Sequence, residues 1–138
     1  MTVPGDGPVC PSADARPGAT LLGILGPRGR VVFLPQGPRV TEDLLAGLAA
    51  TSSPVEARHR FAAPCVARGC AFWDDGRCRA ADVAAAEFPR DNSMAELPEC
   101  GIRDRCRWFF QSGAEACRVC VHVTTAAVSE SAGPVPSV

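Results

Sequence analysis

Two short apolar runs begin the patterned part of the chain. Residues 20–26 and 30–35 are separated by Pro-Arg-Gly at 27–29, and a break of this kind between two apolar runs predicts a β-hairpin. A helix is predicted over 41–50, because two acidic residues lie in its first turn and three leucines form one apolar face.

The second half of the chain mixes strand and helix patterns. A short strand is predicted over 58–62, leading into Cys65, and an alanine-rich helix over 79–88. A further helical turn is predicted over 105–111, ended by Gly113. These patterns predict an α+β fold, in which an N-terminal hairpin and helix support a cysteine-rich region stapled by a metal or a cluster.

The ends of the chain lack such patterns. Residues 1–18 are rich in Pro, Gly and Ala and predict a disordered arm, and residues 126–138 predict a disordered tail. A single cysteine-rich domain is expected over 19–125. The N-terminus has no signal-peptide pattern, and no apolar run approaches the roughly 20 residues of a membrane span. We therefore expect a cytoplasmic protein that is not in a membrane. In the reducing cytoplasm, cysteines are more often metal ligands than partners in disulfides.

The overall composition argues for a small core and against a nucleic-acid partner. The chain is 46% hydrophobic, but much of this is alanine, which fills little volume. A small core often needs a bound metal for stability. The net charge is −1 and the pI about 6.1, whereas proteins devoted to nucleic acids are usually basic.

Seven of the eight cysteines lie in two similar blocks, at 64–78 and 98–120. Each block has a proline shortly before its first cysteine, then an Arg-containing spacer, a second cysteine, an aromatic cluster, a glycine and a closing cysteine. Thiolates concentrated in this way are typical metal ligands. The predicted ligands are Cys65, Cys70, Cys78, Cys100, Cys106, Cys117 and Cys120. Cys10 lies in the predicted arm and is expected to be a free thiol.

The spacing of the cysteines favours an iron–sulfur cluster over zinc. Structural zinc sites usually contain pairs of the type C-x2-4-C. Cys117 and Cys120 form such a pair, Cys65 and Cys70 stand at its upper limit with four residues between them, and the other spacings are more open. Iron–sulfur clusters accept more open spacing because their ligands can come from separate loops. A cluster, of the 4Fe–4S type, is therefore the favoured cofactor, and zinc is the alternative.

Seven thiols are too many for one site with four ligands, and several allocations are open. One cluster could take the four cysteines of the second block, leaving the first block to form a second site completed by His59 or His122. A 4Fe–4S cluster held by only three cysteines would have an open iron that can bind a small molecule. A single site could also draw its ligands from both blocks.

Aromatic and arginine side chains follow the cysteines closely in both blocks. Bulky aromatics beside thiolates exclude water, and guanidinium groups stabilise the negative charge of a thiolate site. We expect the following side chains to surround the ligands: Trp73, Arg103, Arg107, Trp108, Phe109 and His122.

The resulting functional hypothesis is a small iron–sulfur protein. We favour a role in electron transfer or redox sensing over a role as an enzyme. It would transfer electrons to a partner redox enzyme or sense redox state. Two alternatives remain open: a structural zinc module that binds a protein or a nucleic acid, and a catalytic 4Fe–4S protein with an open iron.

Overall fold

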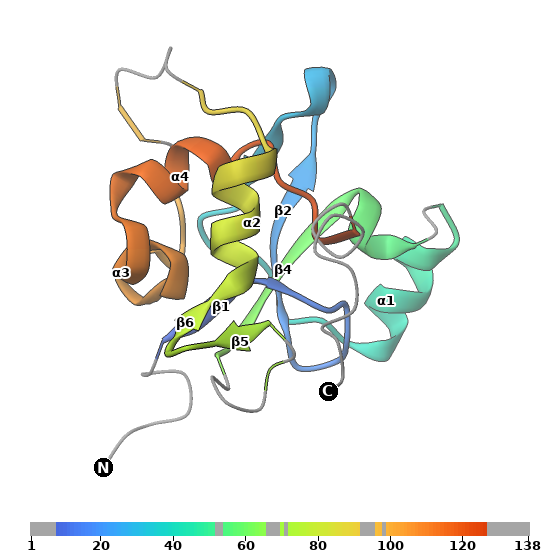
Figure 1. Cartoon of the computed structure of the whole chain (residues 1–138). Coiled ribbons are helices and arrows are strands. Elements are labelled where there is room, and N and C mark those ends of the chain that lie inside the picture. Colours follow the sequence, from blue (N-terminus) through green and yellow to red (C-terminus); the bar gives the residue numbers. More distant parts are fainter. Residues whose placement is uncertain are drawn as a thin grey trace.

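The predicted α+β class is confirmed by a computed structural model, which describes residues 8–51, 54–65, 70, 72–91, 96, 97 and 99–126. A four-stranded antiparallel sheet lies between helix α1 on one side and helices α2, α3 and α4 on the other (Figure 1). The strands are β1 (Val9–Ala13), β2 (Thr20–Leu25), β3 (Val31–Phe33), β4 (His59–Pro64), β5 (Trp73–Asp74) and β6 (Arg77–Cys78). The helices are α1 (Glu42–Ala49), α2 (Arg79–Glu87), α3 (Arg107–Ser112) and α4 (Ala114–Cys120), with short 3-10 turns η1 (Pro27–Gly29), η2 (Val55–Ala57) and η4 (Arg103–Arg105).

The main sheet has the strand order β1-β4-β2-β3. The predicted hairpin is confirmed as β2 and β3, with Gly23 opposite Phe33 and Leu25 opposite Val31. The predicted strand before the first cysteine block is confirmed as β4, which pairs with β1 on one side and β2 on the other. Strand β4 is therefore central, and it ends directly at the first cysteine block.

Both faces of the sheet are buried, because successive side chains of a strand point to opposite faces. Leu21 and Phe61 pack on the face that α1 covers, whereas Leu22 and Ala62 pack on the face covered by α2, α3 and α4. The predicted helix 41–50 is confirmed as α1, where the Thr41 hydroxyl accepts a hydrogen bond from the Leu44 amide at 3.1 Å.

The three remaining helices form the layer that carries most of the second cysteine block. The predicted alanine-rich helix is confirmed as α2, which buries Ala80, Ala81 and Ala84. The predicted helical turn is α3, and Gly113 ends it with a φ of 68° that glycine adopts readily. Helix α4 follows at once and runs to Cys120.

The N-terminal segment differs from its prediction as a disordered arm. Val9–Ala13 forms edge strand β1, in which Cys10 lies opposite Ala63. Val9 is buried at 5% exposure and also bridges to Cys106. The prolines of this segment obscured the strand pattern, although an edge strand tolerates proline because one side of its backbone needs no partner. Residues 1–7 and 127–138 of the two segments predicted to be disordered lie outside the described residues.

The described helices are all too short or too polar to cross a membrane.

Two glycines provide a matched test of this packing. A Cβ atom at Gly37 would overlap the carbonyl oxygen of Leu21, whereas the space around Gly47 in α1 is open. We expect Gly37→Ala to lower the free energy of unfolding by about 1–3 kcal/mol, as overpacking does. Gly47→Ala should raise it by about 0.5–1 kcal/mol, because alanine is the better helix former. Urea denaturation measures both free energies of unfolding. An unchanged free energy of unfolding in Gly37→Ala would contradict the close approach of Gly37 to the Leu21 carbonyl.

Candidate metal centres

The eight cysteines, all free thiols, fall into two sets of four, each of which lines its own cavity. The helical set consists of Cys100, Cys106, Cys117 and Cys120. The strand set consists of Cys10, Cys65, Cys70 and Cys78. All seven predicted ligands therefore line a cavity, and the cysteines of the two blocks line different cavities.

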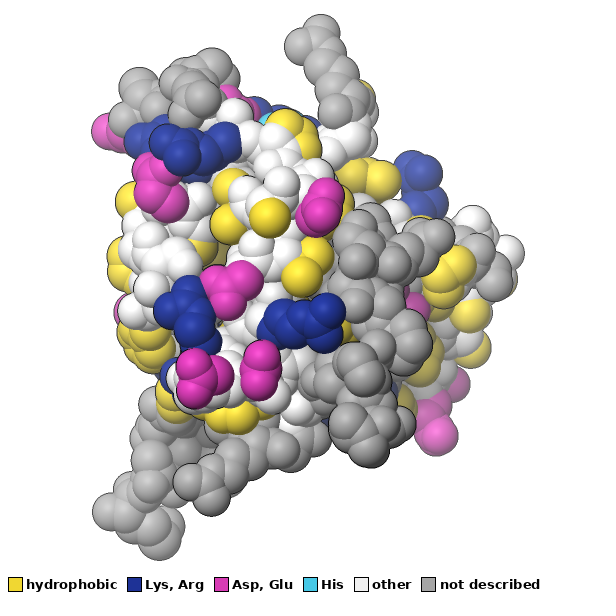
Figure 2. Space-filling model, viewed as in Figure 1, with side chains coloured by type: hydrophobic (Ala, Val, Ile, Leu, Met, Phe, Trp, Pro, Cys, Tyr) yellow, Lys and Arg dark blue, Asp and Glu magenta, His cyan; other side chains and the backbone are white. Residues whose placement is uncertain are grey.

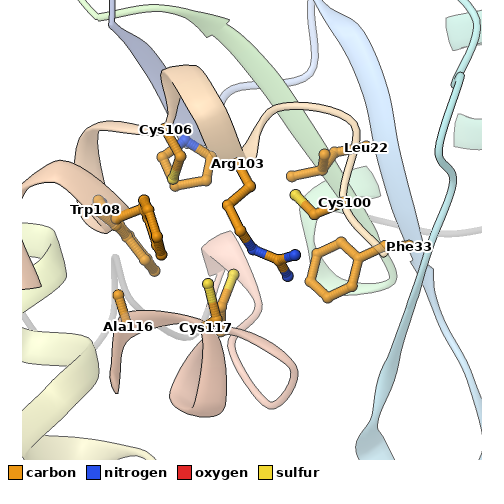
Figure 3. A pocket seen from close by; sticks show the side chains of 11 residues that line it. Leu22, Phe33, Cys100, Arg103, Cys106, Trp108, Ala116 and Cys117 are labelled. Atoms are coloured by element: carbon orange, nitrogen blue, oxygen red, sulfur yellow. The ribbon is translucent and has the colours of Figure 1, made fainter. Parts of the chain in front are cut away.

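The helical set is assembled from three neighbouring segments. Cys100 precedes η4, Cys106 lies between η4 and α3, and the other two cysteines come from α4. Figure 3 shows the cavity between these segments, with Leu22 and Phe33 of the sheet closing it. The wall is otherwise formed by Pro11, Arg103, Trp108, Phe109 and Ala116. Sulfur atoms and apolar side chains thus make up most of this cavity, which keeps water away from the thiols.

Arg103 lies inside the helical-set cavity, as the sequence predicted for a side chain near the ligands. In Figure 3 its guanidinium points between Cys100 and Cys117. Burial raises the pKa of the Cys117 thiol, and the hydrogen bond and charge of Arg103 act in the opposite direction. With the guanidinium in place the cavity measures about 20 Å³, which is room for about one water molecule. A larger bound group would require this guanidinium to turn aside, to the edge of the group.

Arg60 is a buried residue beside the helical set that the sequence prediction missed. It lies on β4 with 1% of its surface exposed. Its guanidinium donates to the carbonyl oxygens of Pro11 at 2.8 Å, Cys120 at 2.8 Å and Val123 at 2.8 Å. It also donates to the Cys120 sulfur at 3.1 Å. An arginine in an otherwise apolar strand was the available signal, because such a residue must be paired when the strand is central.

The guanidinium of Arg60 is also stacked between two aromatic rings. It lies 5.9 Å from the ring centre of Phe33 and 5.8 Å from that of Trp108. No carboxylate forms an ion pair with it in the described part of the chain. The Cys120 sulfur is therefore the group among its hydrogen-bond partners that can carry a negative charge.

Cys10, which the sequence placed apart from the blocks, is a free thiol, but it lines the same cavity as the three cysteines of the first block. Cys10 comes from β1, Cys65 follows β4, Cys70 precedes β5, and Cys78 ends β6. These four line a cavity of about 270 Å³. The other described residues around it include Ser12, Asp14, Arg16, Phe72, Trp73, Arg107, Trp108 and Thr125. Pairing of β1 with β4 brings Cys10 to the first block, which sequence distance had hidden.

Neither histidine is among the residues that line the two cysteine cavities. His59 is buried beside Phe61, and its Nδ1 lies 3.2 Å from the carbonyl oxygen of Val55. His122 was expected near the ligands, but the described contact is its backbone amide, which donates to the Val119 carbonyl at 2.9 Å. Cys10 provides the fourth thiol instead.

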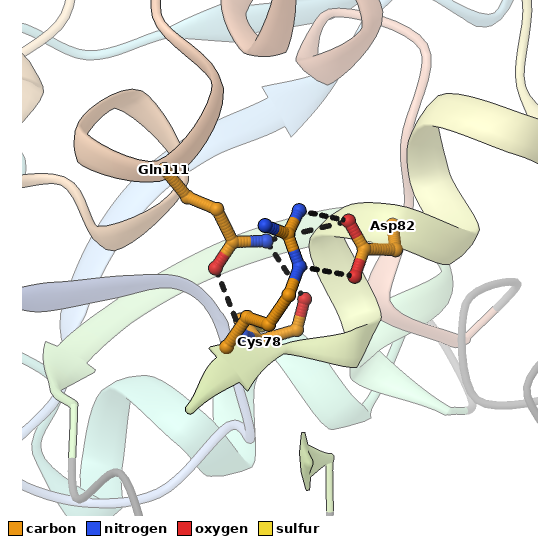
Figure 4. A network of polar contacts seen from close by, with 4 residues as sticks. Cys78, Asp82 and Gln111 are labelled. Carbon is orange, nitrogen blue, oxygen red and sulfur yellow. Dashed lines mark hydrogen bonds and ion pairs between the residues drawn. The ribbon is translucent and has the colours of Figure 1, made fainter. Parts of the chain in front are cut away.

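A side-chain amide positions Cys78. The Gln111 side chain of α3 accepts a hydrogen bond from the Cys78 amide at 2.8 Å and donates to the Cys78 carbonyl at 3.1 Å (Figure 4). It lies beside Asp82, which pairs with Arg77 at 2.6 Å. This network ties the end of the first block to the helix that follows Cys106, and it was not predicted.

Three of the predicted aromatic side chains line the cysteine cavities. Trp108 lines both cavities and Phe109 that of the helical set. Trp73 lines the cavity of the strand set, with the Arg107 guanidinium 5.0 Å from its ring centre. The side chain of Phe110, the residue after Phe109, is instead 54% exposed.

Burial makes several of these thiols poor acids. It raises the pKa of Cys10 to about 12 and that of Cys106 to about 12. It also raises the pKa of Cys78 and of Cys100. These thiols remain protonated at neutral pH unless a bound cation compensates the thiolate charge, as a metal or cluster does.

The surface charge is mixed. Figure 2 shows acidic side chains close to the basic ones across one face of the molecule. Arg77 pairs with Asp82, and Glu115 pairs with Arg90 at 2.6 Å and with Arg118 at 3.7 Å. Two arginines of the cysteine blocks, Arg77 and Arg118, are thus paired with acidic side chains on the surface. Arg103 is instead directed into the helical-set cavity. Arg68 lies outside the described residues.

Comparison with protein-family models, with curated proteins and with solved structures finds no match. Within the described residues, no three His, Cys, Asp or Glu side chains form a group that could hold a metal ion as they stand. The functional argument therefore depends on the two cavities and on the side chains that line them.

Replacement of Arg60 tests its place in the core. Arg60→Met removes the donors to three buried carbonyls, and we expect the free energy of unfolding to fall by about 3–5 kcal/mol. Arg58→Met is the matched control, since Arg58 is exposed two residues away and should change stability by less than about 0.5 kcal/mol. Thermal and urea denaturation measure both variants, and equal effects would contradict the buried position of Arg60.

Proposed function

We propose that this chain is an iron–sulfur protein whose helical set binds a cluster, and that it transfers electrons to a partner enzyme or senses redox state. One observation carries the proposal. Four cysteines line one largely apolar cavity, and the buried guanidinium of Arg60 donates directly to the Cys120 sulfur.

The charge of Arg60 supports a bound, negatively charged group. A buried cation is costly unless an anion or well-placed acceptors compensate it. Three carbonyls satisfy part of its hydrogen-bonding capacity, and its remaining donor meets the Cys120 sulfur. A thiolate bound to iron carries the negative charge that this position favours, and guanidinium donors to cluster sulfur also set the reduction potential.

The distribution of the thiols favours a cluster over a zinc ion. Zinc needs four ligands at about 2.3 Å from one point, usually offered by tight paired turns. Here Cys100 and Cys106 flank η4, and the other two ligands come from a helix on the opposite wall of the cavity. A polynuclear cluster reaches such separated walls more easily than one ion does.

The number of thiols favours electron transfer over catalysis. Four cysteines satisfy all the protein ligands of a cluster and leave no open iron for a substrate. A cluster held in this way stores and releases single electrons. The surrounding residues then exclude water and stabilise charge: Phe33, Trp108 and Phe109 form the apolar wall, and Arg60 and Arg103 supply positive charge.

Metal analysis of protein purified without oxygen tests the proposal. We expect at least about four iron and four sulfide per chain and a broad visible absorption band. Cys106→Ser should lose the iron and sulfide of the helical set, whereas Ala86→Ser, an exposed change in α2, should retain them. A colourless protein that contains stoichiometric zinc and no sulfide would exclude the iron–sulfur function and favour the zinc module.

Arg103 provides a second test with a different readout. Arg103→Gln removes a positive charge directed at Cys100 and Cys117, and since reduction adds negative charge, we expect a lower reduction potential. Arg105→Gln removes the same charge two residues away, outside the residues that line the cavity, and should shift the potential less. Protein-film voltammetry measures the difference, and equal shifts would contradict a specific role for Arg103.

A further inference from the structure

We propose that the strand set, Cys10, Cys65, Cys70 and Cys78, binds a second iron–sulfur cluster, so that the chain carries two. The inference rests on the proposed iron–sulfur function and extends it to a site that the sequence left without a fourth ligand. It uses all eight cysteines of the chain in two groups of four.

The strand-set thiols border a cavity that exposed residues such as Asp14 also line, so they do not serve only to fill a closed core. The strand-set cavity measures about 270 Å³, and four thiols lie in its wall. This room exceeds what one ion needs and suits a body of several iron and sulfide atoms with a ligand on each side.

Three of the four cysteines are held in place by strand pairing or by hydrogen bonds of their own backbone groups. Cys10 lies opposite Ala63 in the β1–β4 pair, and the Cys65 amide donates to the Pro8 carbonyl at 2.9 Å. Cys78 is held by the two hydrogen bonds from the Gln111 side chain. The ligands therefore come from a sheet edge and a hairpin that other contacts already fix, which lowers the cost of ordering them around a cluster.

Two buried donors at this cavity have no hydrogen-bond partner among the described residues. They are the indole Nε1 of Trp108, a residue only 2% exposed, and the Nε of Arg107. Unpaired buried donors are rare and call for a partner. Sulfide and thiolate sulfur of a cluster would accept from both.

The edge strand explains why the site includes a cysteine so distant in sequence. The first block alone offers three thiols, and a cluster with three protein ligands keeps an open iron. Cys10 lines the same cavity and offers the fourth thiol for that position. Both clusters are then fully ligated by cysteine, and Trp108, which lines both cavities, separates them.

Paired cysteine substitutions in the anaerobically purified full chain test the inference. The wild-type chain should hold about eight iron and eight sulfide if both clusters are of the 4Fe–4S type. Cys10→Ser should retain half of this iron and sulfide, and Cys117→Ser, the matched change in the helical set, should also retain half. The double variant should hold neither. Cys70→Ser should repeat the Cys10→Ser result, and circular dichroism establishes that each variant is folded.

The outcomes separate this inference from the function on which it rests. A wild-type chain with about four iron, unchanged in Cys10→Ser and lost in Cys117→Ser, would overturn the second cluster and leave the proposed function intact. A wild-type chain without iron would overturn both. Complete loss of iron in folded Cys10→Ser and in folded Cys117→Ser would show one shared site and overturn the division into two sets.

Discussion

The buried guanidinium of Arg60 is the interaction on which the rest of the structure depends. It connects β4 with the carbonyl of Pro11 in β1 and with the carbonyls of Cys120 and Val123 after the last helix. A charge in this position is tolerated only while every donor is satisfied, so the strand, the helix end and the C-terminal segment must stay together. The same group donates to the Cys120 sulfur, a candidate ligand. Binding of a metal or cluster at this sulfur would therefore change the stability of the fold.

The two cysteine sets have different surroundings, and this has consequences for redox chemistry. The helical set is enclosed by Leu22, Phe33, Trp108 and Phe109, whereas Ser12, Asp14 and Thr125 lie around the strand set. Reduction potentials depend on solvent exposure, charge and hydrogen bonds to sulfur. Two clusters in these surroundings would have different potentials, and both would border Trp108, which lines both cavities.

Local patterns predicted the elements well. The hairpin, α1, β4 and α2 all follow from apolar spacing, turn residues and caps, which act over a few neighbouring residues. The seven cysteines of the blocks were also found from spacing, and all of them line a cavity. Strand β1 was missed because its signal lies in pairing with β4, about fifty residues later, and its prolines resemble those of an unstructured arm.

The sequence by itself determined the α+β class, the positions of most elements and a chemistry based on thiols. Only the tertiary structure decided how the thiols are grouped, because grouping depends on strand pairing and helix packing between distant segments. Cys10 joins the first block through β1, Gln111 holds Cys78 from α3, and Arg60 reaches Cys120 across the sheet. Each of these contacts spans at least thirty residues, beyond the range of any local pattern. The seven cysteines of the blocks and Cys10 therefore form two sets of four only in the folded chain.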